Sequence, residues 1–214
     1  MARLILVRHG ETEWNRLLKY QGQKDIELNK RGLWQAKQTA MRLAPERVDA
    51  IYSSDLKRAV KTAEIIAASL GMTGDIQRTP LLREMNFGDF EGLTFEEIDK
   101  HYQKIILDSM SWKHRSPDMR APNGESLSDV AARVDRFIEH LNPHNLDKTV
   151  LIVAHGGSLQ LLICRMLGIG TEHWWQFRLA DAAVSIVETY PEGASLILLN
   201  GVGHLTRESE ISPS

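Results

Sequence analysis

Short apolar runs alternate with helix-like segments along most of this chain, and this alternation constrains the fold more than any other feature. Strand-like runs lie at 4–7, 50–53, 76–79 and 149–154, and a hairpin is predicted at 184–190 and 195–199. Helix-like segments lie at 33–43, 55–70, 95–107, 126–141 and 158–167. Strands that alternate with helices form mainly parallel sheets covered on both faces. The sequence therefore predicts an α/β protein, a three-layer α/β/α sandwich with a mainly parallel sheet.

The length of 214 residues suits one domain with a sizeable core. We expect this domain to cover 1–205, with an irregular cap or lid at about 94–125 and a polar tail at 206–214. The cap carries a basic stretch, formed by Lys113, His114, Arg115 and Arg120. This stretch fits either a solvated loop or a lid that selects the substrate.

The charge and cysteine content limit the partners and the compartment. A formal net charge of -2 gives no reason to expect nucleic acid or a membrane as a partner, so an anion must be bound by a local cluster of cations. The single cysteine, Cys164, excludes an intramolecular disulfide and favours a cytoplasmic location. The Trp174-Trp175 pair fits the core as well as an interface, which leaves a homodimer open.

Two histidines each follow a predicted strand and precede a glycine. The first strand leads into His9-Gly10, and the strand at 149–154 leads into His155-Gly156. Ligands of parallel sheets bind beyond the carboxyl ends of the strands, and glycine lets the backbone approach a ligand closely. If the two strands are neighbours, both imidazoles lie at one edge of the sheet.

Cations near these histidines point to phosphate chemistry. Arg8 precedes His9, and Arg58 lies near the start of a predicted helix, where an anion is also favoured. A phosphoryl-transfer site must neutralise the phosphate oxygens and hold a nucleophile in line. We expect His9 to be a neutral nucleophile with a pKa lowered by the arginines and a tautomer fixed by the Gly10 carbonyl. His155 is expected to act as a charged donor once phosphate is bound.

A phosphoryl-transfer site also needs a proton donor for the leaving group. Glu84 follows a strand-like apolar segment and is the candidate. We expect it to take up a proton mainly when substrate is bound.

Four spaced motifs resemble those of the histidine phosphatase superfamily, also called phosphoglycerate-mutase-like. They are Arg8–Thr12, Ser53–Ala59 with Thr62-Ala63, Glu84 with Gly88 and Glu91-Gly92, and His155-Gly156. The resemblance spans nearly the whole chain in the family's order. It implies an α/β sandwich and a phosphohistidine intermediate, without a metal or other cofactor.

The resemblance also implies roles for individual residues. It places the nucleophile at His9, the phosphate pocket at Arg8, Arg58 and His155, and the proton donor at Glu84. Further substrate- or phosphate-binding positions are expected at Asn15, Gln21, Gly22 and Gly156. Gly124–Ser126 resembles a family motif near the mouth of the site. Asp181 departs from the pattern, because many relatives carry a neutral asparagine there.

Within the superfamily, the chain looks most like short bacterial α-ribazole phosphatases and broad phosphoglycerate-mutase-like phosphatases. Its segment Leu199–Leu205 resembles the C-terminal pattern of these phosphatases. We therefore expect hydrolysis of a small phosphorylated metabolite, with α-ribazole 5′-phosphate as one candidate. A 2,3-bisphosphoglycerate-dependent mutase is the first alternative, although such mutases are usually longer. A phosphate-binding module without catalysis is the second, and such modules usually lose the nucleophile or a cation.

Overall fold

Six strands form one mixed sheet in the computed structural model, which describes residues 1–72, 74, 76–109, 117–141 and 147–205. The strands are β1 (Ala2–Arg8), β2 (Ala50–Ser54), β3 (Ile76–Thr79), β4 (Thr149–Ala154), β5 (Val184–Tyr190) and β6 (Gly193–Gly201). Their order is β3-β2-β4-β1-β5-β6. Strands β1 to β4 run parallel, whereas β5 is antiparallel to both β1 and β6. The predicted mainly parallel sheet is confirmed.

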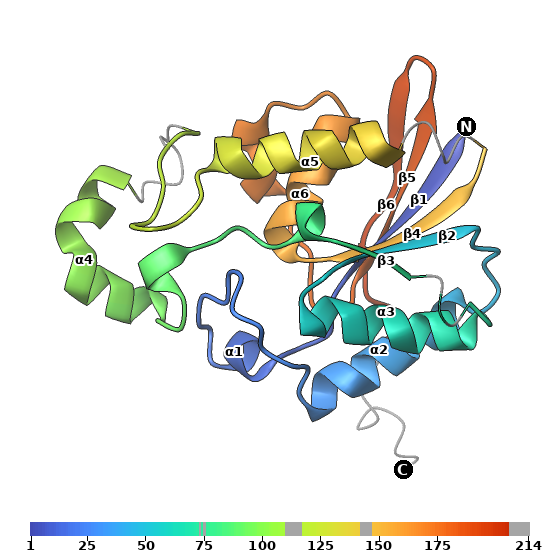
Figure 1. Cartoon of the computed structure of the whole chain (residues 1–214), viewed down its shortest axis with the longest axis horizontal. Coiled ribbons are helices and arrows are strands. Elements are labelled where there is room, and N and C mark those ends of the chain that lie inside the picture. Colours follow the sequence, from blue (N-terminus) through green and yellow to red (C-terminus); the bar gives the residue numbers. More distant parts are fainter. Residues whose placement is uncertain (73, 75, 110–116, 142–146, 206–214) are drawn as a thin grey trace, which may run out of the picture.

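Helices cover both faces of this sheet. They are α1 (Glu13–Arg16), α2 (Lys30–Leu43), α3 (Lys57–Ser69), α4 (Phe95–Ser109), α5 (Leu127–Leu141) and α6 (Gly156–Met166). Short 3-10 helices lie at η1 (Pro80–Leu82), η2 (Gly88–Phe90) and η4 (Thr171–Gln176). Helices α2 and α3 lie on one side of the sheet and α5 and α6 on the other, while α4 projects away from the sheet (Figure 1). The three-layer sandwich is therefore confirmed.

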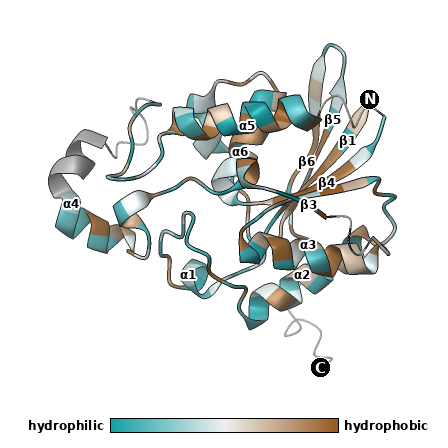
Figure 2. Cartoon of the chain, in the orientation of Figure 1, coloured by the Kyte–Doolittle hydropathy of each residue, from teal (hydrophilic) through white to brown (hydrophobic). Residues whose placement is uncertain are grey.

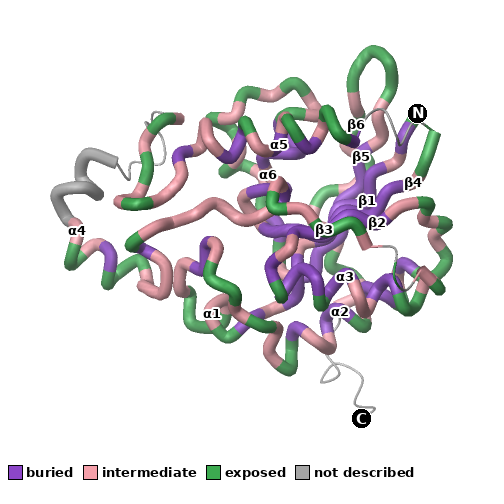
Figure 3. The backbone as a smooth tube through the Cα atoms, viewed as in Figure 1, coloured by how far each residue is buried: buried purple, intermediate pink, exposed green. Residues whose placement is uncertain are grey.

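Two apolar clusters explain why the first strand is apolar without interruption. Leu4 and Leu6 belong to a cluster with residues of α5 and α6, and Ile5 and Val7 to one with residues of α2 and α3. Successive side chains of a strand point to opposite faces, so a strand buried on both faces needs apolar residues at every position. The buried strands lie between the two layers of helices (Figure 3), where hydrophobic residues also concentrate (Figure 2).

Several helix ends differ from expectation, and local capping explains some of them. Helices α2 and α3 begin at Lys30 and Lys57 rather than at 33 and 55. Ser126 caps α5 as predicted, because its Oγ accepts from Asp129 N at 3.1 Å. Helix α6 begins at Gly156, two residues before the predicted start, because His155 is its N-cap. The four-residue helix α1 was not predicted, and its N-cap is Thr12.

The expected cap segment is only partly described. Helix α4 is kinked at Tyr102, with φ -126° and ψ 25°, and it extends to Ser109, past the predicted end. Lys113, His114 and Arg115 lie outside the described residues, as does the expected tail at 206–214. Arg120 is described and pairs with Asp129 at 3.2 Å. Among the described residues, none of the helices combines the length and apolar character needed to span a membrane.

Candidate active site

The carboxyl ends of β1 and β4 bring His9 and His155 together. The two strands pair in parallel with Arg8 opposite Ala154, so a histidine follows each member of this pair. The two rings are buried, with centroids 5.1 Å apart in an edge-to-face arrangement. The imidazoles thus share one edge of the sheet, as the two His-Gly pairs predict.

The tautomer of His9 is fixed by its own backbone neighbour. Its Nδ1 lies 2.7 Å from the carbonyl oxygen of Gly10, and only an N–H can face a carbonyl. Nδ1 therefore bears the proton, and Nε2 carries the lone pair. Burial, followed by the charges of Arg58 and Arg8, lowers the pKa of His9 well below its usual 6.5. A neutral imidazole with a free lone pair is the form that a nucleophile requires.

Arg58 connects both imidazoles to the loop after α1. It is the second residue of α3 and is fully buried. Its Nε donates to His9 Nε2 at 3.3 Å and to His155 Nδ1 at 3.2 Å. Its two terminal nitrogens donate to the carbonyls of Gly22 and Lys24, each at 2.7 Å. Burial lowers the pKa of Arg58 to about 10, so the side chain stays charged at neutral pH.

His155 is held by a hydroxyl rather than by a carbonyl. Its Nε2 lies 2.8 Å from Ser54 Oγ at the end of β2, while Nδ1 accepts from Arg58. Burial and then Arg58 lower the pKa of His155 well below 6.5. The protein alone therefore favours neutral His155, and the expected charged form depends on a bound anion. Because Arg58 can only donate, neutral His155 carries its lone pair on Nδ1, and its Nε2 donates to Ser54 Oγ.

Arg8 contributes the second guanidinium of the site, and its two terminal nitrogens already contact other groups of the protein. Its Nη1 donates to Leu179 O at 2.6 Å, and its Nη2 lies 2.8 Å from Asp181 Oδ1. The Asp181 contact is an ion pair without hydrogen-bond alignment, since the buried Oδ1 accepts no hydrogen bond from a described residue. Arg8 Nε is also buried without such a partner among the described residues. This unused donor fits an anionic oxygen.

Replacing Asp181 by asparagine is expected to tighten the binding of inorganic phosphate about fivefold at pH 7.5. The carboxylate offsets part of the Arg8 charge that attracts the anion, and the amide does not. Burial raises the pKa of Asp181 against the opposing effect of Arg8, so the wild-type carboxyl becomes neutral as the pH falls through that raised pKa. The difference between the two proteins should therefore shrink on acidification. Isothermal titration calorimetry at two pH values measures it, and equal affinities at pH 7.5 would exclude this role.

Glu84 is fixed near the start of α6 by backbone donors. Its Oε2 accepts from Gly157 N at 3.0 Å and its Oε1 from Met85 N at 2.9 Å. A Cβ on Gly157 would lie 2.5 Å from Glu84 Oε1, whereas one on Gly156 would lie 3.7 Å from Arg8 Nε and from Glu84 Oε2. Gly157 thus lets Glu84 approach the start of α6, whereas a Cβ at Gly156 would make only ordinary contacts.

A second ion pair holds the backbone that carries Glu84. Arg133 of α5 donates to the carbonyls of Leu81, Arg83 and Glu84 at 2.9, 3.1 and 3.3 Å. It also pairs with both oxygens of Glu125, each at 2.8 Å. Glu125, predicted to lie near the mouth of the site, therefore orients Arg133.

Arg133→Met is expected to lower kcat about tenfold with alkyl phosphates, which have poor leaving groups, and to change KM little. A looser Glu84 backbone misplaces the carboxyl that would protonate the departing oxygen. Arg136→Met is the matched control, since Arg136 is exposed on the same helix. Steady-state kinetics with ethyl phosphate and with 4-nitrophenyl phosphate test the effect. An equal loss with both substrates would show that Arg133 acts only through general stability.

The other predicted binding positions support the site from the loop after β1. Gly22 contacts Arg58 through its carbonyl, and its φ of +51° favours glycine. Thr12 Oγ1 donates to Gln21 Oε1 at 2.8 Å, and Thr12 N donates to Asn15 Oδ1 at 3.0 Å. Asn15 and Gln21 thereby order the loop, and their contact with a substrate remains a prediction.

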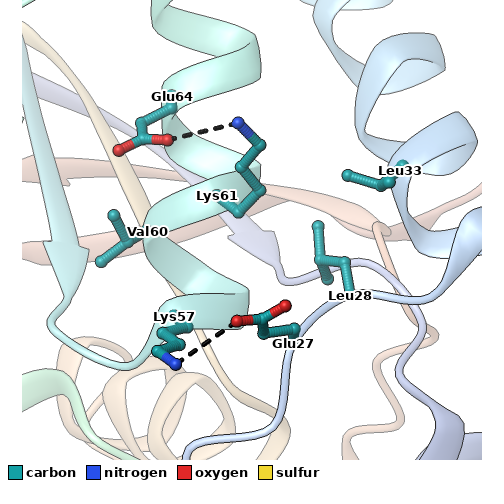
Figure 4. Close-up of a pocket in the computed structure, with 7 residues that line it drawn as sticks. All are labelled: Glu27, Leu28, Leu33, Lys57, Val60, Lys61 and Glu64. Carbon is teal, nitrogen blue, oxygen red and sulfur yellow. Dashed lines mark hydrogen bonds and ion pairs between the residues drawn. The ribbon is translucent and has the colours of Figure 1, made fainter.

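Cavities lie on both sides of the sheet in the described part of the chain. One of about 230 Å³ is lined by Arg8, Glu84 and Gly156 on its catalytic side. The other, of about 380 Å³, lies between α2 and α3 (Figure 4). Its two lysines are paired, Lys57 with Glu27 at 3.3 Å and Lys61 with Glu64 at 3.6 Å, so they are not available for an anion. The smaller cavity is the one that is lined by Arg8 and Glu84.

The sequence interpretation did not assign three contributors, Ser54, Arg133 and Gly157. Ser54 belongs to the Ser53–Ala59 motif, and Gly157 directly follows Gly156, so the sequence motifs could have indicated both residues. Arg133 had no local signal, because its contact with Glu84 spans 49 positions of sequence. Within the described part of the chain, no group of three or more His, Cys, Asp or Glu side chains is arranged to hold a metal ion.

Comparison with known proteins places this geometry in context. A family model described as histidine phosphatase superfamily, branch 1, matches residues 4–201. Phosphoserine phosphatase 1 of Hydrogenobacter thermophilus is 33% identical over 96% of this chain and 95% of that protein. A 2,3-bisphosphoglycerate-dependent phosphoglycerate mutase of Bartonella henselae is 36% identical over 90% and 94%. The crystal structure of an α-ribazole phosphatase from Shigella flexneri matches with a TM-score of 0.81 and 31% identity, over 94% of this chain and 98% of that one.

Proposed function

The chain belongs to branch 1 of the histidine phosphatase superfamily, and we propose that it is a phosphomonoester hydrolase that works through a phosphohistidine on His9. The observation that carries this proposal is the state of His9. Its Nδ1 is bound to Gly10 O, and its Nε2 lone pair points to Arg58 beside a second imidazole. A neutral ring with one defined lone pair, next to two arginines, suits in-line attack on a phosphate group.

The first step transfers the phosphoryl group to the protein. His9 Nε2 attacks phosphorus, the N–P bond forms and the P–O ester bond breaks. Arg8, Arg58 and His155 bind the non-bridging oxygens, whose charge they offset in both the ground state and the transition state. Glu84 donates its proton to the ester oxygen, and the alcohol leaves.

The second step returns the phosphoryl group to water. Glu84, now a carboxylate, takes a proton from water, and the water oxygen attacks phosphorus. The N–P bond breaks, inorganic phosphate leaves, and His9 recovers its lone pair. Glu84 thus serves as acid and then as base, and no step uses a metal or another cofactor.

We propose a small phosphorylated metabolite as the substrate, with α-ribazole 5′-phosphate as one candidate. The similarity to a solved α-ribazole phosphatase supports that candidate, while similarity to a phosphoserine phosphatase and to a mutase supports others. A cytoplasmic location is part of the proposal, and the single buried Cys164 is consistent with it.

The test is phosphate release from a panel of phosphomonoesters in the presence of EDTA. The panel includes α-ribazole 5′-phosphate, phosphoserine, 3-phosphoglycerate and 4-nitrophenyl phosphate. We expect EDTA-resistant release from at least one of them. Isomerisation of 3-phosphoglycerate that depends on 2,3-bisphosphoglycerate, without phosphate release, would instead identify a mutase. Phosphate binding without either reaction would identify a non-catalytic module.

A further inference from the structure

The cavity beside Glu84 is where the organic part of a substrate must go. In the proposed reaction, the ester oxygen receives its proton from Glu84, so the group attached to that oxygen extends past this carboxyl. The cavity of about 230 Å³ has Arg8, Glu84 and Gly156 at its catalytic end. Its far walls therefore contact the leaving group rather than the phosphate.

These walls are apolar and come from four parts of the chain. They include Met85 and Phe87 after Glu84, Leu127 and Val130 on α5, Leu161 on α6, and Trp174 on η4. Leu127 and Trp174 are half-buried and can contact a ligand, whereas Val130 and Leu161 are fully buried behind this surface. Segments that are distant in sequence thus all contribute apolar side chains to one cavity.

Most polar side-chain groups of the lining have partners within the protein, and the exception described above, Arg8 Nε, lies at the catalytic end. Gln160 donates its side-chain amide to Phe177 O. Arg8 is the one cation among the described lining residues, and it is bound to Leu179 O and Asp181. A substrate carboxylate placed against the far walls would lose hydration without gaining a cationic partner, and it would lie near the Glu84 carboxyl.

From this lining we propose that the enzyme prefers phosphomonoesters whose alcohol part is apolar and uncharged near the ester oxygen, such as arylalkyl or alicyclic phosphates. Phosphorylated hydroxy acids and amino acids, which carry a carboxylate near that oxygen, are expected to be poor substrates. This inference rests on the proposed function and deepens it. A cavity of about 150 Å³ with apolar walls accepts benzene in another protein, so the larger cavity here admits one ring with a short linker.

The test compares phosphate esters of alcohols with similar acidity, so that leaving-group chemistry stays nearly constant. Ethyl, butyl and 2-phenylethyl phosphate form one series, and phosphoserine and 3-phosphoglycerate are the charged competitors. Each buried methylene contributes about a fourfold gain in affinity, so kcat/KM should rise at least about tenfold from ethyl to 2-phenylethyl phosphate. The 2-phenylethyl ester should also exceed both charged competitors.

A charge placed in the wall should reverse this order. Leu127→Lys is expected to lower kcat/KM for 2-phenylethyl phosphate about tenfold or more and to raise it for 3-phosphoglycerate, because the new cation supplies the missing partner. Met41→Lys is the control, since Met41 is exposed on α2, across the sheet from α5. The wild-type series decides the question even if Leu127→Lys fails to fold.

Two outcomes overturn the inference in distinguishable ways. Rapid hydrolysis of 4-nitrophenyl phosphate with a flat alkyl series, or with preference for phosphoserine or 3-phosphoglycerate, would overturn the substrate class and leave the hydrolase intact. No phosphate release from any ester, 4-nitrophenyl phosphate included, would overturn the proposed function and the substrate class together.

Discussion

Replacing His9 by alanine is expected to lower phosphate release from 4-nitrophenyl phosphate by at least about a thousandfold. Alanine removes Nε2, the atom that forms the N–P bond, while Arg8 and Arg58 still bind phosphate. His155 is not expected to take over. Its ring is held through both nitrogens, with Nε2 bonded to Ser54 Oγ and Nδ1 accepting from Arg58, which suits a supporting role beside the nucleophile.

The measurement pairs steady-state kinetics with trapping of the intermediate. Rapid quenching of the wild type at alkaline pH, followed by mass spectrometry, should reveal one added phosphoryl group on the peptide that contains His9, and the alanine variant should lack it. His101→Ala is the control, because His101 is exposed on α4 and should leave both readouts unchanged. Undiminished turnover in the His9 variant would remove it as the nucleophile and with it the proposed mechanism.

The two histidines of the site could be predicted from the sequence, because an apolar run followed by a His-Gly pair is a local signal. Apolar runs at 4–7 and 149–154 predict buried strands, and each run leads into a His-Gly pair. Only the neighbouring positions of β1 and β4 in the sheet turn these pairs into one site, and strand order is a property of the whole fold. The Gly10 carbonyl as partner of His9 was predictable, because it is the next residue along the chain.

Contacts between distant segments could not be predicted in the same way. Arg8 and Asp181 meet because β1 and the loop before β5 come together, and nothing local to either residue indicates the ion pair. Helix α6 begins before its apolar pattern does, since His155 acts both as the N-cap and as an imidazole of the site. Capping by histidine is rarer than capping by serine or aspartate, so the apolar pattern alone placed the start too late.

Glu84→Gln is expected to lower the rate of phosphorylation by ethyl phosphate by about 10² to 10⁴ and to leave phosphorylation by 4-nitrophenyl phosphate within about tenfold of wild type. An alkoxide needs a proton as it departs, whereas nitrophenolate leaves without one. The glutamine also cannot act as the base that activates water. The variant should therefore release one equivalent of nitrophenolate per active site in a burst and then turn over slowly.

The burst separates a proton-transfer role from a structural one. Both carboxylate oxygens of Glu84 accept backbone N–H groups, from Met85 and Gly157, and the glutamine amide nitrogen cannot accept. The substitution thus disturbs local geometry as well, and a purely geometric effect would slow the burst with 4-nitrophenyl phosphate as much as the reaction with ethyl phosphate. Stopped-flow absorbance of nitrophenolate gives the burst rate, and Glu96→Gln, at an exposed position of α4, is the control. Because the proton-transfer role predicts a dependence on the leaving group and the geometric effect predicts none, a loss that is uniform across substrates would assign the proton to another donor.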